Sequence, residues 1–399
     1  MLLVKRTSKV KQKLLKFNFF FADFVNSHQS ETHTGTIFAL LTIIFFNFAF
    51  ERKKILSVNF RMIGKIKILL SKVASPVKLE KLINSSGQHL FLPFYHLVSD
   101  NDLPHIKHLY PIVSVERFKK DLDFFEKHYS PIAANELTER ISSGKPIVEN
   151  RFFLSFDDGL REFYDTVAPI LLQRGIPATF FVNTDFIDNK DMFFRLKTSI
   201  LIDKITKRGL SEAESATVNS LFASVNLSYN HVSDLLKITF QKRHILDKIA
   251  DVADVDFQDY LTKQKPYLTS EQIRKLIAQG FTIGAHSVSH PYYADLSEKE
   301  QTEQTLDSLN FIKENFQPEQ RLFSFPFTDF GVDKSFFDKI KQETDLTFGT
   351  ASLKLDSIKN NLQRTPMENS GYSSTEAFIK SEYLMFMLKK TIGKHIIHR

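Results

Sequence analysis

Short apolar runs alternate with longer segments of helical periodicity over most of the chain beyond residue 90. In the longer segments, apolar residues recur every three or four positions, as on the buried face of a helix. The short runs are apolar on both faces, as in strands buried inside a parallel sheet, and they are 90–96, 152–156, 178–182, 281–283, 322–327 and 346–349. This order of strands and helices predicts an α/β fold made of parallel β/α units.

Several helices can be placed from their capping residues and periodicity. Two helix starts carry the capping-box pattern, at Thr269 and at Ser297. Apolar spacing predicts another helix over 115–129. A helix over 163–173 contains Pro169, which either kinks the helix or marks its true first turn.

Residues 189–266 interrupt the alternation of strands and helices. The segment is long, mostly helical in pattern and partly polar, which predicts a helical insertion that forms a cap beside the functional site. The alternative is a surface excursion without a role. Arg195 and Lys197, near its start, are candidates for contacting an anionic group of a substrate.

The N-terminal part differs in character from the rest of the chain. We divide the sequence into a basic and apolar segment over 1–61, an amphipathic helix and linker over 62–89, and a main domain over 90–399. Residues 36–50 carry no charge, but a membrane-spanning helix needs about 20 apolar residues. Three interpretations stay open: a short membrane anchor, an atypical signal peptide, or sequence that precedes a true start of translation at Met62. The cell envelope, a membrane surface and the cytoplasm are therefore all open as locations.

Charge is distributed unevenly along the chain. The net charge is +7, and residues 1–90 carry 15 Lys and Arg against 4 Asp and Glu, so the remainder is acidic. A basic, apolar N-terminus favours association with a membrane surface over binding to nucleic acid, and we find no nucleic-acid-binding motif. The chain has no cysteine, which excludes disulfides and thiolate metal ligands.

Two adjacent carboxylates end the strand predicted over 152–156. Asp157, Asp158 and Gly159 follow it directly. Neighbouring residues of a strand point in opposite directions, so the two acids should have different roles. The alternative is an ordinary polar turn.

Two histidines follow another predicted strand, 281–283. His286 and His290 are four residues apart, and imidazole with carboxylate is a common ligand set for a divalent transition metal such as zinc. Three protein ligands would leave a fourth position for water, as in catalytic sites. The alternative is a pair of structural or surface histidines.

These two stretches resemble the first two motifs of the polysaccharide deacetylase family, carbohydrate esterase family four. Residues 155–159 read Ser-Phe-Asp-Asp-Gly, where the family usually has Thr-Phe-Asp-Asp-Gly, and residues 286–290 match the pattern His-(Ser/Thr)-x-x-His. The third motif matches in part at 324–327, where Ser324 replaces the common Arg. The resemblance covers roughly residue 90 to the C-terminus and implies a distorted (β/α)7 barrel.

The resemblance also implies roles for individual residues. It implies Asp158, His286 and His290 as ligands of a divalent metal, zinc foremost, and Asp157 as general base. His96, after the first strand, is similar to the acid histidine of the poly-N-acetylglucosamine deacetylase-like branch. Pro326 and Phe327, in the third motif, and Arg364 are candidate substrate-binding residues. Arg364 or Arg321 can also take the place of the missing motif arginine.

The expected function is metal-dependent removal of acetyl groups from an N-acetylated glycan. Two alternatives stay open. Ser324, the absence of a late Leu-x-His motif and the absence of Trp motivate a catalytically degenerate glycan-binding protein, and the N-terminal segment motivates a membrane-bound scaffold. The sequence leaves the natural glycan, the oligomeric state and the identity of the metal open.

Overall fold

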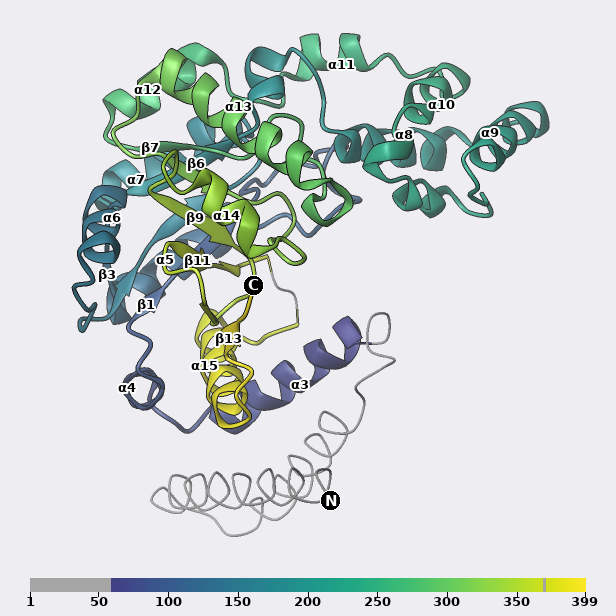
Figure 1. Cartoon of the computed structure of the whole chain (residues 1–399). Coiled ribbons are helices and arrows are strands. Elements are labelled where there is room, and N and C mark those ends of the chain that lie inside the picture. Colours follow the sequence, from purple (N-terminus) through teal and green to yellow (C-terminus); the bar gives the residue numbers. More distant parts are fainter. Residues whose placement is uncertain (1–58, 369–370) are drawn as a thin grey trace, which may run out of the picture. The chain divides into compact units, whose positions relative to one another are not determined.

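The computed structural model describes residues 59–368 and 371–399 (Figure 1). The predictions for residues 1–58 therefore lie outside the described part. None of the described helices combines the length and apolar character needed to cross a membrane. The described chain divides into two units, one formed by 90–352, 358–368 and 399, the other by 59–89, 353–357 and 371–398.

The larger unit is built on a parallel sheet with the strand order β11-β9-β8-β7-β6-β5-β2-β12. Its strands are β2 Pro93–Tyr95, β5 Leu154–Phe156, β6 Ala178–Val182, β7 Thr282–Ala285, β8 Leu322–Ser324, β9 Leu346–Gly349, β11 Asn361–Gln363 and β12 Thr365–Pro366. Nearly every residue of β5, β6, β8 and β9 is buried, which explains why these runs are apolar on both faces.

The sheet closes through its last strand. β11 and β12 lie at opposite edges of the sheet, yet only Arg364 separates them in the chain. They form one interrupted strand, so the eight described strands occupy seven positions around the sheet. This confirms the predicted distorted (β/α)7 barrel.

The strand predicted over 322–327 is shorter than expected. β8 ends at Ser324, although the amide of Phe325 still donates to the carbonyl of Phe348. Pro326 follows and has no N–H to continue the ladder. The chain therefore leaves the sheet at this point, inside the third motif.

A second, three-stranded sheet with the order β1-β4-β3 lies within the same unit. It consists of β1 Leu90–Phe91, β3 Ser130–Pro131 and β4 Arg151–Phe152. A buried cluster that includes Leu137, Phe153, Phe181 and Phe348 packs beside it, and the rings of Phe153 and Phe348 stack with centres 5.2 Å apart.

The helices that follow the strands are α5 Val115–His128, α6 Ala134–Ser143, α7 Ala168–Arg174, α12 Ser270–Ala278, α13 Glu298–Phe316 and α14 Lys334–Ile340. α5, α12 and α13 begin at or next to the predicted residues, whereas the helix predicted over 163–173 begins at Ala168. Thr269 and Ser297 form the predicted capping boxes of α12 and α13. Pro169 lies in the first turn of α7, after a π-helical turn over Phe163–Val167, so the second of the two interpretations of this proline is correct.

The segment between β6 and β7 is helical. It contains α8 Phe194–Arg208, α9 Glu212–Ser224, α10 Ile245–Ala253 and α11 Phe257–Gln264, with 3₁₀ turns at η2 Thr184–Asn189, η3 Val232–Lys237 and η4 Phe240–Lys242. Figure 1 shows α8, α9 and α10 grouped together to one side of the barrel strands. This group belongs to the helical insertion, residues 189–266, discussed below.

The smaller unit contains α3 Asn59–Ala74, α4 Leu79–Ser86 and α15 Thr375–Thr391, together with the paired strands β10 Leu355–Asp356 and β13 Ile396–Ile397. Lys67 of α3 pairs with the buried carboxylate of Glu382 of α15 at 2.5 Å. Burial of an unpaired carboxylate is costly, so this ion pair specifies how α3 and α15 associate.

Candidate active site

The residues with candidate chemistry follow the carboxyl ends of neighbouring parallel strands. Parallel strands bring these ends to one rim of a barrel, where active sites are built. His96 follows β2, Asp157 and Asp158 follow β5, and His286 follows β7. The rim thus gathers residues that are up to 190 positions apart in the sequence (His96 to His286).

Asp158, His286 and His290 form a compact buried group. One ligand atom from each lies within 4.8 Å of the others. The Asp158 Oδ1 atom is 3.1 Å from Nε2 of His290 and 3.5 Å from Nε2 of His286. It is buried and accepts no hydrogen bond from the described residues. A bare carboxylate oxygen facing two imidazole nitrogens fits a divalent cation, so these residues suit the metal that the family motifs imply.

Hydrogen bonds orient the histidines of this group. His286 Nδ1 lies 2.8 Å from the carbonyl oxygen of Ser324. When Nδ1 carries the proton and donates it to that carbonyl, Nε2 is left unprotonated toward Asp158. Asn183 donates to the carbonyl of His286, and the His290 amide donates to Ser287 Oγ at 3.0 Å.

The backbone at the site is strained in several places. Asp158, Ser287, His290 and Phe327 all have positive φ, between 57° and 77°. Such conformations cost of order 1–3 kcal/mol each for residues other than glycine. Gly159 also has positive φ, and a Cβ atom there would lie 3.2 Å from Val182. The turns that present the acids and histidines are therefore held against local preference by the surrounding contacts.

Asp157 is clamped by Arg364. Both side chains are almost fully buried, and the two guanidinium N–H groups donate to the two carboxylate oxygens at 2.8 and 2.7 Å. Burial alone would raise the pKa of Asp157, but the charge and hydrogen bonds of Arg364 outweigh it and lower the pKa. Asp157 is therefore held as a carboxylate.

Arg364 occupies the position at which the last strand of the barrel is interrupted. It also donates to Ser155 Oγ at 3.0 Å and to Ser324 Oγ at 2.6 Å, and its guanidinium lies 4.3 Å from the ring centre of Phe94. Ser324 leaves room for this arginine to approach from another strand. Arg321, the other candidate, instead pairs with Asp345.

His96 pairs with a residue that the sequence analysis did not identify, Glu368. His96 Nδ1 lies 3.1 Å from Glu368 Oε1, and the amide of His96 donates to the same oxygen. Burial lowers the pKa of His96, but the carboxylates of Glu368, Asp158 and Asp157 outweigh it and raise the pKa to about 9. Glu368 comes two residues after β12, and this place at the same rim is the signal that could have identified it.

Tyr110 lies between His96 and Asp158 and contacts both. Its ring centre is 4.8 Å from that of His96, and its hydroxyl lies 3.4 Å from Asp158 Oδ2. The side chain of His96 stays 27% exposed, so a substrate can reach it.

Aromatic side chains flank His290. The ring of Phe193 is 4.2 Å away and that of Phe327 is 4.7 Å away. Phe193 immediately precedes α8, so the helical insertion contributes to the wall of the site. Phe327 is 41% exposed, whereas Pro326 is buried, so only Phe327 of this pair is presented to solvent.

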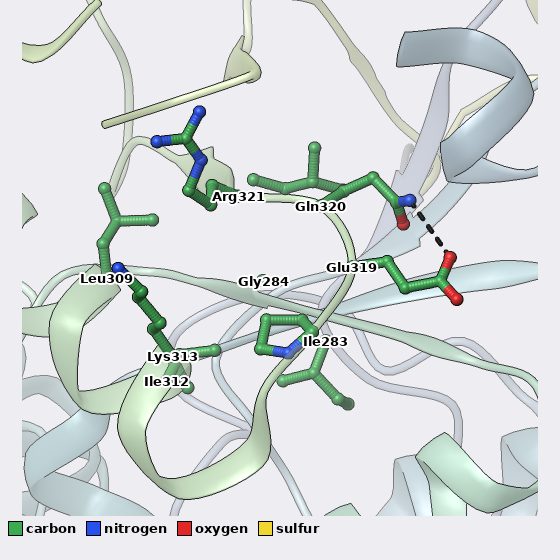
Figure 2. Close-up of a pocket in the computed structure, with 10 residues that line it drawn as sticks. Ile283, Gly284, Leu309, Ile312, Lys313, Glu319, Gln320 and Arg321 are labelled. Carbon is green, nitrogen blue, oxygen red and sulfur yellow. Dashed lines mark hydrogen bonds between the residues drawn. The ribbon is translucent and has the colours of Figure 1, made fainter. Parts of the chain in front are cut away.

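A cavity of about 130 Å³ lies outside this site (Figure 2). It is lined by residues of β7, by α13 and by the segment that leads into β8, including Lys313, Glu319 and Gln320. It opens near the beginning of β8, whereas the candidate site follows the strand ends. None of the acids or histidines described above lines it.

Comparison with known proteins agrees with the motifs. The profile of the family described as "Polysaccharide deacetylase" matches residues 145–343. No curated protein sequence matches the chain.

Several solved structures resemble the chain at low sequence identity. A Streptococcus pyogenes deacetylase, PplD, in complex with acetate is 14% identical, with 74% of this chain and 96% of that chain covered and a TM-score of 0.46. IcaB from Ammonifex degensii is 15% identical, with 73% and 97% covered and a TM-score of 0.46. A de-N-acetylase from Aggregatibacter actinomycetemcomitans is 14% identical, with 72% and 99% covered and a TM-score of 0.43.

Proposed function

The chain belongs to the polysaccharide deacetylase family and is a deacetylase-type hydrolase, and from this premise we propose that it hydrolyses the N-acetyl groups of a glycan with the help of a divalent metal. In this proposal Asp158, His286 and His290 hold the metal, and zinc suits two imidazoles and a carboxylate. Asp157 serves as general base and His96 as general acid.

The observation that carries this proposal is the difference between the two adjacent carboxylates. Asp158 faces two imidazole nitrogens with a bare oxygen, whereas Asp157 is held by both arms of the Arg364 guanidinium. One acid is suited to bind a cation, and the other is suited to remain ionised and accept a proton. A site used only for binding has no need of this division.

The chain's own residues provide the proton transfers of amide hydrolysis. When bound, the metal supplies Lewis acidity and lowers the pKa of a coordinated water toward about 7. Asp157 accepts the proton from the attacking water, and Arg364 fixes the direction of its carboxylate. With a pKa of about 9, His96 is protonated at neutral pH and can donate to the departing amine, while Glu368 orients its ring.

The arrangement around Arg364 also bears on the degenerate glycan-binding alternative. That alternative was motivated in part by Ser324 at the position of the family arginine. Because Arg364 reaches Asp157 from another strand, the chain has a cation at this carboxylate. The enzymatic interpretation is therefore favoured over the binding one.

Metal removal is the most direct test. The full chain should release acetate from N-acetylglucosamine oligomers when supplied with zinc, lose this activity with a chelator and regain it with added metal, because three ligands alone cannot activate water. Acetate is measured directly, and bound metal is measured per chain. Release that persists after complete removal of metal would contradict the proposed role of Asp158, His286 and His290.

His96→Ala should lower kcat by about 10²–10⁴-fold, the usual contribution of a general acid, with unchanged metal content.

In the unaltered protein, kcat should fall as pH rises through about 9, because His96 then loses its proton. Glu368→Gln should move this fall to lower pH, since the Glu368 carboxylate helps to raise the pKa of His96. The measurement is a pH profile of kcat for the unaltered protein and for Glu368→Gln. Coincident profiles would argue against the His96–Glu368 pair.

A further inference from the structure

Two arginines of the helical insertion, Arg195 and Arg243, have no acidic partner among the described residues. Arg195 donates to the carbonyl of Leu236 at 2.6 Å and lies 4.8 Å from the ring centre of Phe194. Arg243 donates to the carbonyl of Phe240 at 2.7 Å and lies 3.7 Å from the ring centre of Phe240. Within the described part of the chain, neither guanidinium pairs with a carboxylate.

This lack of a partner sets them apart from most arginines of the protein. The other arginines whose side chains are described pair with Asp or Glu, except Arg274 on α12. The guanidinium of Arg274 lies 5.6 Å from the ring centre of Phe316. Lys197, which the sequence analysis grouped with Arg195, pairs with Asp247 at 2.8 Å. The prediction of an anion contact therefore stays open for Arg195, whereas the charge of Lys197 is already balanced.

Contacts between side chains connect the segments that carry both arginines to the candidate metal group. Arg195 comes two residues after Phe193, whose ring lies 4.2 Å from that of His290. The rings of Phe194 and Phe240 are 6.0 Å apart, so the segments that carry the two arginines pack together. Gln241 Nε2 also donates to the carbonyl of Asp295 at 3.4 Å, which connects this edge of the insertion to the segment that follows His290.

A guanidinium in this setting is suited to an oxyanion. It has five N–H donors in a planar fork, and Arg195 and Arg243 each use one nitrogen in the hydrogen bonds described above. Arg195 is half-buried, and burial lowers its pKa with no carboxylate to offset the effect. Contact with a ring restricts the movement of each guanidinium, which favours binding of a carboxylate or phosphate.

We propose that Arg195 and Arg243 bind an anionic group of the glycan, next to the sugar whose acetyl group is removed. The proposal rests on the proposed deacetylase function and specifies its substrate class as an acidic glycan, with carboxylate or phosphate groups along the chain. The insertion then selects the substrate by charge, while the barrel rim supplies the chemistry.

The test compares neutral and acidic substrates of matched length. The neutral substrate is an N-acetylglucosamine oligomer. The carboxylate probe alternates N-acetylglucosamine with glucuronate, and the phosphate probe joins N-acetylglucosamine units through phosphodiesters. Arg195→Gln and Arg243→Gln are compared with Arg274→Gln, a matched control that removes an exposed, ring-stacked arginine from α12.

The intact protein should prefer one of the acidic probes in kcat/KM. Arg195→Gln and Arg243→Gln should each lower this preference about ten-fold through KM, as expected for a charge-assisted hydrogen bond, whereas Arg274→Gln should leave it unchanged. Raised salt should weaken the preference. The probe that is preferred distinguishes carboxylate from phosphate.

Binding of the same probes, measured calorimetrically, provides a readout that does not need turnover. Binding of an acidic probe that depends on both arginines, without acetate release from any probe, would support anion binding by the two arginines. The same result would contradict the proposed deacetylase function. Equal handling of neutral and acidic probes by the intact protein, or an equal effect of Arg274→Gln, would overturn this proposal. Acetate release from the neutral oligomer would in that case still support the proposed function.

Discussion

Arg364→Ala is expected to eliminate most acetate release and to lower the free energy of unfolding by about 3–5 kcal/mol. The substitution leaves the carboxylate of Asp157 buried without its counter-charge and removes both hydrogen bonds from the guanidinium, while those from Ser324 Oγ at 3.3 and 3.4 Å remain. It also empties a fully buried space beside Phe94, Phe181 and Phe348. Acetate release and urea-induced unfolding measure the two effects separately.

Two further variants separate charge from geometry at this position. Arg364→Lys keeps the positive charge but cannot donate to both oxygens of Asp157 from a planar fork, so it should recover part of the stability and little of the turnover. Arg321→Ala removes a partly exposed arginine paired with Asp345, and should cost no more than about 1 kcal/mol. If Arg364→Ala retained full activity, Arg364 would not be the group that positions the base.

Asp157→Asn is expected to lower kcat by about 10²–10⁴-fold, because an amide of nearly the same shape cannot accept the proton of the attacking water. The metal content should remain one per chain, since Asp158, His286 and His290 are unchanged. Asp158→Asn should instead lower the metal content. Elemental analysis of both variants, together with acetate release, makes the comparison.

The stability of Asp157→Asn provides an internal check. The variant leaves Arg364 buried without a carboxylate, so unfolding should become easier even though the shape of the side chain is kept. The double variant Asp157→Asn with Arg364→Met should recover part of the lost stability, because both charges are then absent. If Asp157→Asn released acetate at nearly the rate of the unaltered protein, the proposed role of Asp157 as general base would be contradicted.

The parts of the site that could be predicted from the sequence are those written in short, local patterns. Asp157 and Asp158 directly follow one buried strand, and His286 and His290 closely follow another strand. Strand ends and spacing therefore suffice to identify these four residues. Their pairing at one rim follows from the parallel order of β5 and β7. The parallel β/α units follow from the alternation of apolar runs and helical periodicity, whereas the barrel was implied by the family resemblance.

The residues that sequence reasoning placed less well depend on contacts between distant segments. Arg364 was one of two candidates to replace the missing motif arginine, because nothing near it or Arg321 in sequence indicates which of them meets Asp157, 207 positions from Arg364. Glu368 was missed for the same reason. Lys197 has the right charge and neighbourhood, but α10 supplies Asp247 to pair with it.

The strained backbone was also beyond sequence reasoning. Positive φ at Asp158, Ser287, His290 and Phe327 runs against the preference of these residue types, except in part for Asp and His. Local propensity therefore gives no sign of it. The conformation follows from contacts such as the bonds of Gln304 Oε1 with the amides of Val288 and Ser289.

The closing strand of the barrel has a consequence for the newly made polypeptide. Asp157 is translated early, but Arg364 lies between β11 and β12, near the end of the chain. A ribosome-bound chain that lacks β12 has an open sheet, with β2 as an unpaired edge, and Arg364 is not yet held beside Asp157. Because closing such a long loop is slow, we expect the proposed base to become competent only when synthesis is almost complete. Under this proposal, the arginine that orients Asp157 also delays activity until the barrel has closed.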